Sequence, residues 1–147
     1  MNEEQQIIRD EALRLKPYLD CCGQYWRNCA CAKKGKLSIG IGRNLDDVGI
    51  SEDEAHYLFR IDLAKARSAV YSIPWVLGLH VARRAVLINM CFNLGLRGLL
   101  NFKRMLAAAQ AGNWRAAAAH LLDSNYAHQV GERAVRLAKQ LETAQWR

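Results

Sequence analysis

The 147-residue sequence contains no long apolar run and no leader-like segment. No stretch approaches the ~20 apolar residues that a membrane-spanning helix needs. The N-terminus, Met-Asn-Glu-Glu-Gln-Gln, has neither the positive nor the apolar region of a secretory signal. Repeats and low-complexity tracts are also lacking, and a composition of 51% hydrophobic and 24% charged residues excludes disordered and collagen-like chains. We therefore expect one globular domain that is made in a cytoplasm without a signal peptide.

Acidic residues are scarce in the second half of the chain. Residues 1–72 hold 11 Lys/Arg and 11 Asp/Glu, so their net charge is zero. Residues 73–147 hold 10 Lys/Arg and 3 Asp/Glu, so the whole net charge of +7 lies in this half of the chain. This asymmetry predicts an anionic partner such as nucleic acid, a membrane surface or an acidic polymer. The alternative is that the excess Lys and Arg residues lie on exposed helix faces and only increase solubility.

Hydrophobic periodicity predicts an α+β fold that is predominantly α-helical. A strand is expected over Lys36–Gly42, and residues 21–36 are expected to form a loop or irregular hairpin. Ser51 and Glu54 form a capping box at the start of a helix. The expected helices cover Glu3 to Lys16 (ending before Pro17), about Asp53 to Tyr71, Val81 to Leu94, about Asn101 to Gln110, about Asn113 to Leu122, and a terminal segment from near Glu132.

Two carboxyl groups near the N-terminus are candidates for acid–base chemistry. On a helical wheel Glu11 lies within an apolar stripe, between Ile7 and Leu15. Apolar neighbours remove hydration and so favour the protonated carboxyl, as a general acid requires. Asp20 follows in a more solvated loop, where it can stay ionised, and two carboxylates in unlike environments suit glycoside hydrolysis. The alternatives are a boundary Glu paired with a basic residue and an ordinary turn Asp.

The expected strand contributes a third candidate. Ser38, Gly40 and Gly42 share the face opposite its apolar residues, and glycines in a strand mark a close approach by a ligand or another backbone. The serine hydroxyl beside this bare surface can hold a water or a sugar hydroxyl. The alternative is a bulge or a tight contact between lobes. A dinucleotide-binding fingerprint is excluded because its third glycine is missing.

Five cysteines occur, and four of them lie within eleven residues. These four are Cys21, Cys22, Cys29 and Cys31, whereas Cys91 lies in an apolar run and is expected in the core. The Cys-Cys-x6-Cys-x-Cys spacing is not a common zinc pattern. A structural zinc ion, free thiols and disulfides formed in an oxidising periplasm all remain open.

Several blocks together resemble the T-even bacteriophage lysozyme family, glycoside hydrolase family 24. They are residues 9–20 (Arg-Asp-Glu-Ala-Leu-Arg-Leu-Lys-Pro-Tyr-Leu-Asp), 37–42 (Leu-Ser-Ile-Gly-Ile-Gly), 50–55 (Ile-Ser-Glu-Asp-Glu-Ala), 83–85 (Arg-Arg-Ala), 88–95 (Ile-Asn-Met-Cys-Phe-Asn-Leu-Gly) and 112–114 (Gly-Asn-Trp). The resemblance covers nearly the whole chain in order. It implies a lysozyme-like domain over residues 1–147, with a small β-hairpin lobe (about 1–55), a connecting helix (about 53–72) and a helical lobe (about 73–147). The chain departs from the family pattern by an insertion of about a dozen residues between Asp20 and Ser38. This insertion carries the four clustered cysteines.

The resemblance also implies roles for individual residues. Glu11 matches the family's general acid, Asp20 the residue that activates water, and Ser38 a catalytic threonine whose hydroxyl it keeps. The implied substrate contacts are Asn44, Phe92, Asn93, His120 and Arg133. The implied reaction is hydrolysis of the β-1,4 bond between N-acetylmuramic acid and N-acetylglucosamine in peptidoglycan, without a cofactor.

These expectations describe a monomeric phage endolysin that accumulates in the host cytoplasm and reaches the periplasm after holin release. Its partner is peptidoglycan, and the cationic half suits an anionic outer-membrane surface rather than a specific nucleic acid. One competing hypothesis is a lytic transglycosylase on the same substrate, which needs the acid but no base. Another is a cationic protein that permeabilises membranes through the basic segment 131–147.

Overall fold

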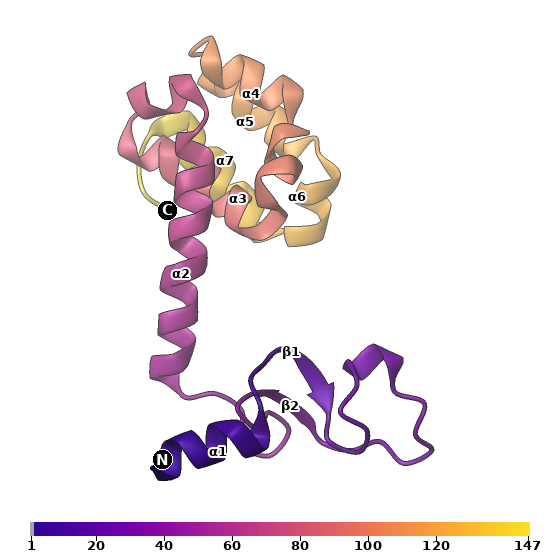
Figure 1. The fold of residues 1–147 in the computed structure, drawn as a ribbon. Helices are drawn as coiled ribbons and strands as arrows, with labels where there is room; N and C mark the ends of the chain where they lie inside the picture. Colours follow the sequence, from indigo (N-terminus) through magenta and orange to yellow (C-terminus); the bar gives the residue numbers. More distant parts are fainter. Residues whose placement is uncertain (1) are drawn as a thin grey trace. The chain divides into compact units, whose positions relative to one another are not determined.

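The computed structural model describes residues 2–147, which divide into two compact units (Figure 1). The first unit ends at His56, and the second unit covers Tyr57–Arg147. The described residues form seven α-helices and one three-stranded antiparallel sheet. The predicted α+β, predominantly helical fold is therefore confirmed.

The first unit begins with helix α1, Glu3–Glu11, which is capped by the Asn2 side chain. Strand β1, Arg14–Leu19, follows directly, so the helix predicted to continue to Lys16 is wrong at its C-terminal end. Pairing across a sheet overrides the local helix pattern here, because β1 lies antiparallel to β2, Leu37–Gly40. Pro17 is tolerated since β1 is an edge strand of the order β1-β2-β3.

The strand predicted over Lys36–Gly42 is shorter than expected. Gly40 and Gly42 have φ values of +70° and +66°, a conformation that favours glycine and ends β2 in a tight turn. The chain then reverses into the short strand β3, Arg43–Asn44. Between β1 and β2 the segment 21–36 is irregular, as predicted, apart from a 3-10 helix at Trp26–Asn28 and an isolated bridge between Tyr18 and Tyr25.

Few side chains of the first unit are buried. Among its described residues only Leu19, Cys29 and Ser38 are classed as buried, and the main hydrophobic core lies wholly in the second unit. Polar contacts supplement this small core: the Lys36 Nζ to Asp47 Oδ1 distance is 2.7 Å. A unit of this size with so little apolar burial needs other sources of stability.

Helix α2, Glu52–Tyr71, begins in the first unit and continues in the second. The predicted capping box is confirmed: the Ser51 hydroxyl accepts from the Glu54 N–H at 3.2 Å, and the Glu54 carboxylate accepts from the Ser51 N–H at 2.7 Å. The Ser51 backbone hydrogen bond is the main reason why the pKa of Glu54 is lowered.

The second unit is helical throughout. After a 3-10 helix at Pro74–Gly78, its helices are α3 (Val81–Leu100), α4 (Lys103–Gln110), α5 (Trp114–Leu122), α6 (Asn125–Val130) and α7 (Glu132–Thr143). Helix α3 is broken at Gly95, whose φ of 71° is not helical, and then continues to Leu100. The short helix α6 was not predicted, because six residues are too few to show a periodic pattern.

The core of the second unit forms around α3, α5 and α7, and α5 packs on both α4 and α7 (Figure 1). Cys91 is buried in it, as predicted. Arg83 of α3 ties these helices together: its guanidinium lies 3.9 Å from the centre of the Trp114 ring and donates to the carbonyls of Leu141 and Glu142, each at 2.9 Å. These carbonyls belong to the last turn of α7, where carbonyl groups have no N–H donor within the helix.

No single helix in residues 2–147 has the length and apolar content of a membrane span. Helices α3 and α4, which meet at 98°, pass this test only as a bent pair and only by length and composition.

Candidate functional site

The first unit carries all three predicted catalytic residues on or beside its sheet. Glu11 is the last residue of α1, Ser38 lies in β2, and Asp20 directly follows β1. Ser38 pairs with Tyr18 across β1 and β2, so the serine lies two residues from Asp20 in the pairing register. The structure therefore places Ser38 in the sheet and Asp20 in the turn just beyond the end of β1.

The environment predicted for Glu11 is wrong. Leu15 lies in β1 rather than on the helix, no residue of α1 is buried, and Ile7 is 55% exposed. The apolar stripe is interrupted because the chain leaves the helix immediately after Glu11. Ala12 there adopts φ 58° and ψ 151°, a strained conformation for a residue with a Cβ atom.

Gly42 makes a close approach, but to the side chain of Glu11 rather than to the ligand or backbone that the strand pattern predicted. A Cβ atom added to Gly42 would lie 2.5 Å from Oε2 of Glu11 and 2.9 Å from its carboxyl carbon. The β2–β3 turn thus packs directly against the Glu11 carboxyl group. Any larger residue at position 42 would displace that group.

Asp20 is exposed, and its backbone and side chain are both anchored to Lys36. Its Oδ1 accepts from the Lys36 N–H at 2.8 Å, and its own N–H donates to the Lys36 carbonyl at 3.1 Å. Gly35 packs against it: a Cβ there would lie 1.9 Å from Oδ1 of Asp20 and 2.6 Å from the backbone nitrogen of Cys21. Sequence reasoning missed Gly35, because a glycine within a lysine-rich loop gives no sign of what it approaches.

Ser38 is 5% exposed and lies between two strands, opposite Tyr18 on one side and Asn44 on the other. Asn44, a predicted substrate contact, makes two hydrogen bonds with Asp47. The Asn44 amide nitrogen donates to Oδ2 of Asp47 at 2.9 Å, and the Asp47 N–H donates to Oδ1 of Asn44 at 3.1 Å. The Lys36 ammonium group is the main cause of a lowered pKa at Asp47. The structure brings Ser38 and Asn44 together as paired residues.

The remaining predicted substrate contacts lie in the second unit, on helices α3, α5 and α7. Phe92 is 45% exposed and contacts the Phe59 ring at a centroid distance of 5.7 Å, and Asn93 beside it is also exposed. Arg133 of α7 lines a cavity of about 320 Å³ that does not include His120. Within this unit, therefore, the structure does not bring these residues into one pocket.

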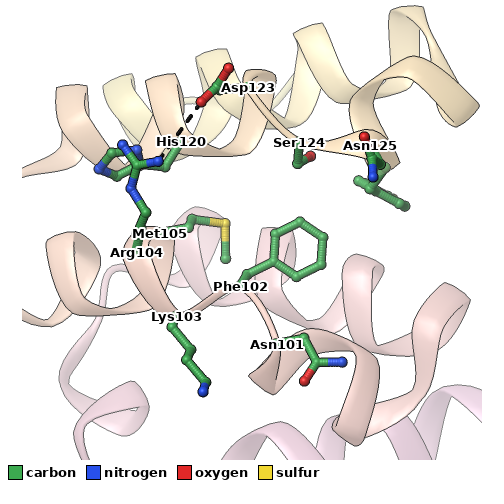
Figure 2. Close-up of a pocket in the computed structure, with 10 residues that line it drawn as sticks. Asn101, Phe102, Lys103, Arg104, Met105, His120, Asp123, Ser124 and Asn125 are labelled. Atoms are coloured by element: carbon green, nitrogen blue, oxygen red, sulfur yellow. Dashed lines mark ion pairs between the residues drawn. The ribbon is translucent and has the colours of Figure 1, made fainter.

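His120 lines a cavity of about 470 Å³ between α4, α5 and α6 (Figure 2). Figure 2 shows Phe102 and Met105 on one wall, facing Ser124 and Asn125 on the other. Arg104 and Asp123, which also line the cavity, form an ion pair of 4.0 Å. Its full lining is Asn101, Phe102, Lys103, Arg104, Met105, His120, Asp123, Ser124, Asn125 and Tyr126.

Four thiols of the first unit converge. The Sγ atoms of Cys21, Cys22, Cys29 and Cys31 all lie within 4.8 Å of one another, and they form a candidate metal-binding group. A backbone hydrogen bond from Cys31 is the main cause that lowers the pKa of Cys29 to about 7. Hydrogen bonds to the neighbouring thiols, first that of Cys21, raise the pKa of Cys31 to about 12. The sequence identified these residues but could not establish that they meet.

Comparison with known proteins finds a matching family model and several relatives, which include a phage protein and a lysozyme. The family model described as phage lysozyme matches residues 9–141. The chain is 32% identical to the pre-baseplate central spike protein of Enterobacteria phage T4, over 93% of this chain and 27% of that protein. It is 30% identical to a probable T4-type lysozyme 1 of Dictyostelium discoideum, over 64% of this chain and 58% of that protein. The chain thus spans about a quarter of the first relative and less than two thirds of the second.

Proposed function

The chain belongs to the phage lysozyme family, and from this premise we propose that it hydrolyses the β-1,4 bond between N-acetylmuramic acid and N-acetylglucosamine in peptidoglycan. The observation that carries the proposal is the placement of Glu11, Ser38 and Asp20 around one small sheet. Two carboxyl groups and a hydroxyl meet the needs of glycoside hydrolysis, which takes one acid and one activated water. No cofactor enters this reaction.

Each of the three residues has one task. Glu11 donates its proton to the glycosidic oxygen, so that the leaving sugar departs as an alcohol. Asp20 accepts a proton from a water molecule, whose oxygen bonds to the anomeric carbon of the other sugar. Ser38 holds that water by its hydroxyl group. The anchoring of Asp20 by Lys36 supports this role, because a base that is already positioned loses little freedom in the reaction.

Replacing the acid tests the proposal. We expect Glu11→Gln to abolish clearing of a peptidoglycan suspension, since an amide cannot donate the proton, while the circular dichroism spectrum stays unchanged. The matched control is Asp10→Asn, which removes an adjacent carboxylate that pairs with Arg9 on the exposed helix surface. Clearing by Glu11→Gln at the rate of the control would remove Glu11 from the mechanism.

Product analysis separates hydrolysis from the transglycosylase alternative. Hydrolysis adds water and leaves reducing sugar ends, whereas a transglycosylase closes an internal anhydro ring without water. Mass spectrometry of digested peptidoglycan distinguishes the two by the mass of one water. A product set made only of anhydro ends would exclude the role proposed for Asp20.

In the proposed setting the protein is a monomeric endolysin that is made in the host cytoplasm and acts on the cell wall after a holin opens the inner membrane. Asn44, Phe92, Asn93, His120 and Arg133 contact the sugar strand in this proposal. The similarity to a spike protein favours a second setting, in which the same reaction is carried out by a component of the phage particle. Finding the protein in purified particles rather than in the soluble lysate would favour the second setting.

Permeabilisation of membranes by the C-terminal segment is less well supported. Leu137 and Leu141, which that hypothesis needs on a membrane-facing surface, are buried in the core. Val135 and Trp146 remain exposed beside basic residues, which leaves an electrostatic contact with an anionic outer membrane as part of the proposal. Killing of Gram-negative cells by the Glu11→Gln protein is the observation that would favour a membrane activity.

A further inference from the structure

The distances between the clustered thiols match those of a metal tetrathiolate. The Sγ atom of Cys21 lies 3.6 Å from that of Cys29 and 3.9 Å from that of Cys22. A zinc–sulfur bond of ~2.3 Å gives a tetrahedron whose sulfur–sulfur edges are roughly 3.8 Å long. All four Sγ atoms lie within 4.8 Å of one another, so one ion can reach each of them after small side-chain adjustments.

The same distances favour one metal ion shared by the four thiols over two disulfides. A disulfide requires a sulfur–sulfur distance of ~2.05 Å and separates four cysteines into two distinct pairs. Here Cys21 is about equally far from Cys22 and from Cys29, so no exclusive pair is formed. Four Sγ atoms that all lie within 4.8 Å of one another fit a single tetrahedral centre.

Backbone hydrogen bonds hold the two halves of the cluster in place. Cys21 and Cys22 lie in a turn after β1, where the N–H groups of Cys22 and Gly23 donate to the Leu19 carbonyl at 3.4 and 2.8 Å. A backbone bond of 2.8 Å from Asn28 to Tyr25 closes the 3-10 turn that precedes Cys29. The thiols therefore meet because of the fold of the loop, in a sequence spacing that is not a common zinc pattern.

The charge around the cluster complements a metal tetrathiolate. A divalent ion with four thiolates carries a net charge of −2, which must be offset where it is partly buried. Residues 21–36 contain no acidic residue and four cations, Arg27, Lys33, Lys34 and Lys36, of which Lys36 pairs with Asp47. The Lys34 ammonium group donates to the Cys29 carbonyl and so lies next to the cluster. Cys29 itself is 8% exposed, and Cys31 is half-buried.

We propose that Cys21, Cys22, Cys29 and Cys31 bind one zinc ion, which orders segment 21–36 of the first unit. This site has a structural role, because all four positions of the ion are filled by protein ligands. It supplies folding free energy to a unit in which Leu19 and Cys29 are the only buried apolar side chains among its described residues. The segment begins beside Asp20 and ends at Lys36, so the ion would also stabilise the loop that anchors Asp20.

Metal analysis of the full chain tests the site independently of any activity. The untagged protein is expressed with zinc in the medium and purified without a chelator, and its metal content is measured by mass spectrometry. We expect about one zinc per chain and four thiols that react only after a chelator removes the ion. Iron in place of zinc, or less than about a tenth of a zinc per chain, would overturn the proposal. So would a mass lower by four hydrogens, which would reveal two disulfides.

Matched cysteine variants locate the ion. Cys29→Ser should lose at least tenfold in zinc content, whereas Cys91→Ser should retain one zinc, since Cys91 lies in the core of the second unit. If Cys29→Ser does not yield folded protein, chelator-treated wild type is titrated with Co²⁺. Tetrahedral thiolate coordination then gives intense charge-transfer absorption that saturates at one Co²⁺ per chain and is displaced by zinc. An absent band, or equal zinc in both variants, would refute the site.

Discussion

Replacing Gly35 by Ala perturbs Asp20 without touching its chemistry. The added Cβ would lie 1.9 Å from Oδ1 of Asp20, 2.6 Å from the backbone nitrogen of Cys21 and 2.9 Å from the Cys21 Cβ. The carboxylate can rotate away, but the backbone nitrogen cannot. Relief of the clash must therefore shift the loop as well as the side chain.

The size of the effect follows from these contacts. Fitting a methyl group into such a packed site costs about 1–3 kcal/mol. Loss of the hydrogen bond from the Lys36 N–H to Asp20, which is exposed, adds only about 1 kcal/mol. We therefore expect Gly35→Ala to lower the free energy of unfolding by about 2–4 kcal/mol. A carboxylate displaced by about 1 Å should reduce the rate of peptidoglycan cleavage by about 10²-fold.

The assay combines thermal unfolding with initial rates of clearing. Gly78→Ala is the matched control, because a Cβ at Gly78 meets no atom within 4 Å and its φ is not positive. A double-mutant cycle with Asp20→Asn shows whether the loss of activity passes through Asp20. In the Asp20→Asn background, Gly35→Ala should cause no further loss of rate.

Two results would refute this reasoning. If Gly35→Ala clears peptidoglycan as fast as Gly78→Ala, the close approach of Gly35 does not determine the position of Asp20. If the effects of Gly35→Ala and Asp20→Asn on the rate multiply, Gly35 acts through some other part of the protein.

Three further predictions concern stability and pH. Arg83→Met removes two hydrogen bonds and a ring contact, so it should lower the free energy of unfolding by about 3–4 kcal/mol, as measured by calorimetry. The control Arg104→Met should show little change, because its ion pair is exposed. Ala12→Gly removes a strained φ of 58° and should stabilise the first unit by about 1 kcal/mol, seen as slower amide hydrogen exchange in β1; unchanged exchange would contradict the strain. Lys36 lowers the pKa of Asp47, so the Asp47 carboxylate contributes fully to the free energy of unfolding above the ordinary aspartate pKa of 3.8. This contribution is lost as the pH falls through the lowered pKa, and a difference in melting temperature between wild type and Asp47→Asn that persists at pH 2 would contradict this.

The sequence determined those features whose causes are local. Helix α2 begins after the predicted capping box and ends at Tyr71, since both signals lie within a few residues of the boundary. The apolar pattern of α3 identified the central buried helix. Asn113 caps α5, because its side chain accepts a hydrogen bond from the Ala116 N–H. The order of motifs likewise indicated the family that the comparison supports over residues 9–141.

Tertiary structure alone decided the features that depend on residues far apart in the chain. Helix α1 stops at Glu11 because Arg14–Leu19 pairs with β2, and no pattern within residues 3–16 records that pairing. Gly35 packs on Asp20, fifteen positions earlier, and the thiols of Cys21 and Cys31 meet across a loop. Local sequence specifies the hydrogen bonds within a helix. The contacts that position a carboxylate or assemble a metal site form only when the loops between those elements close.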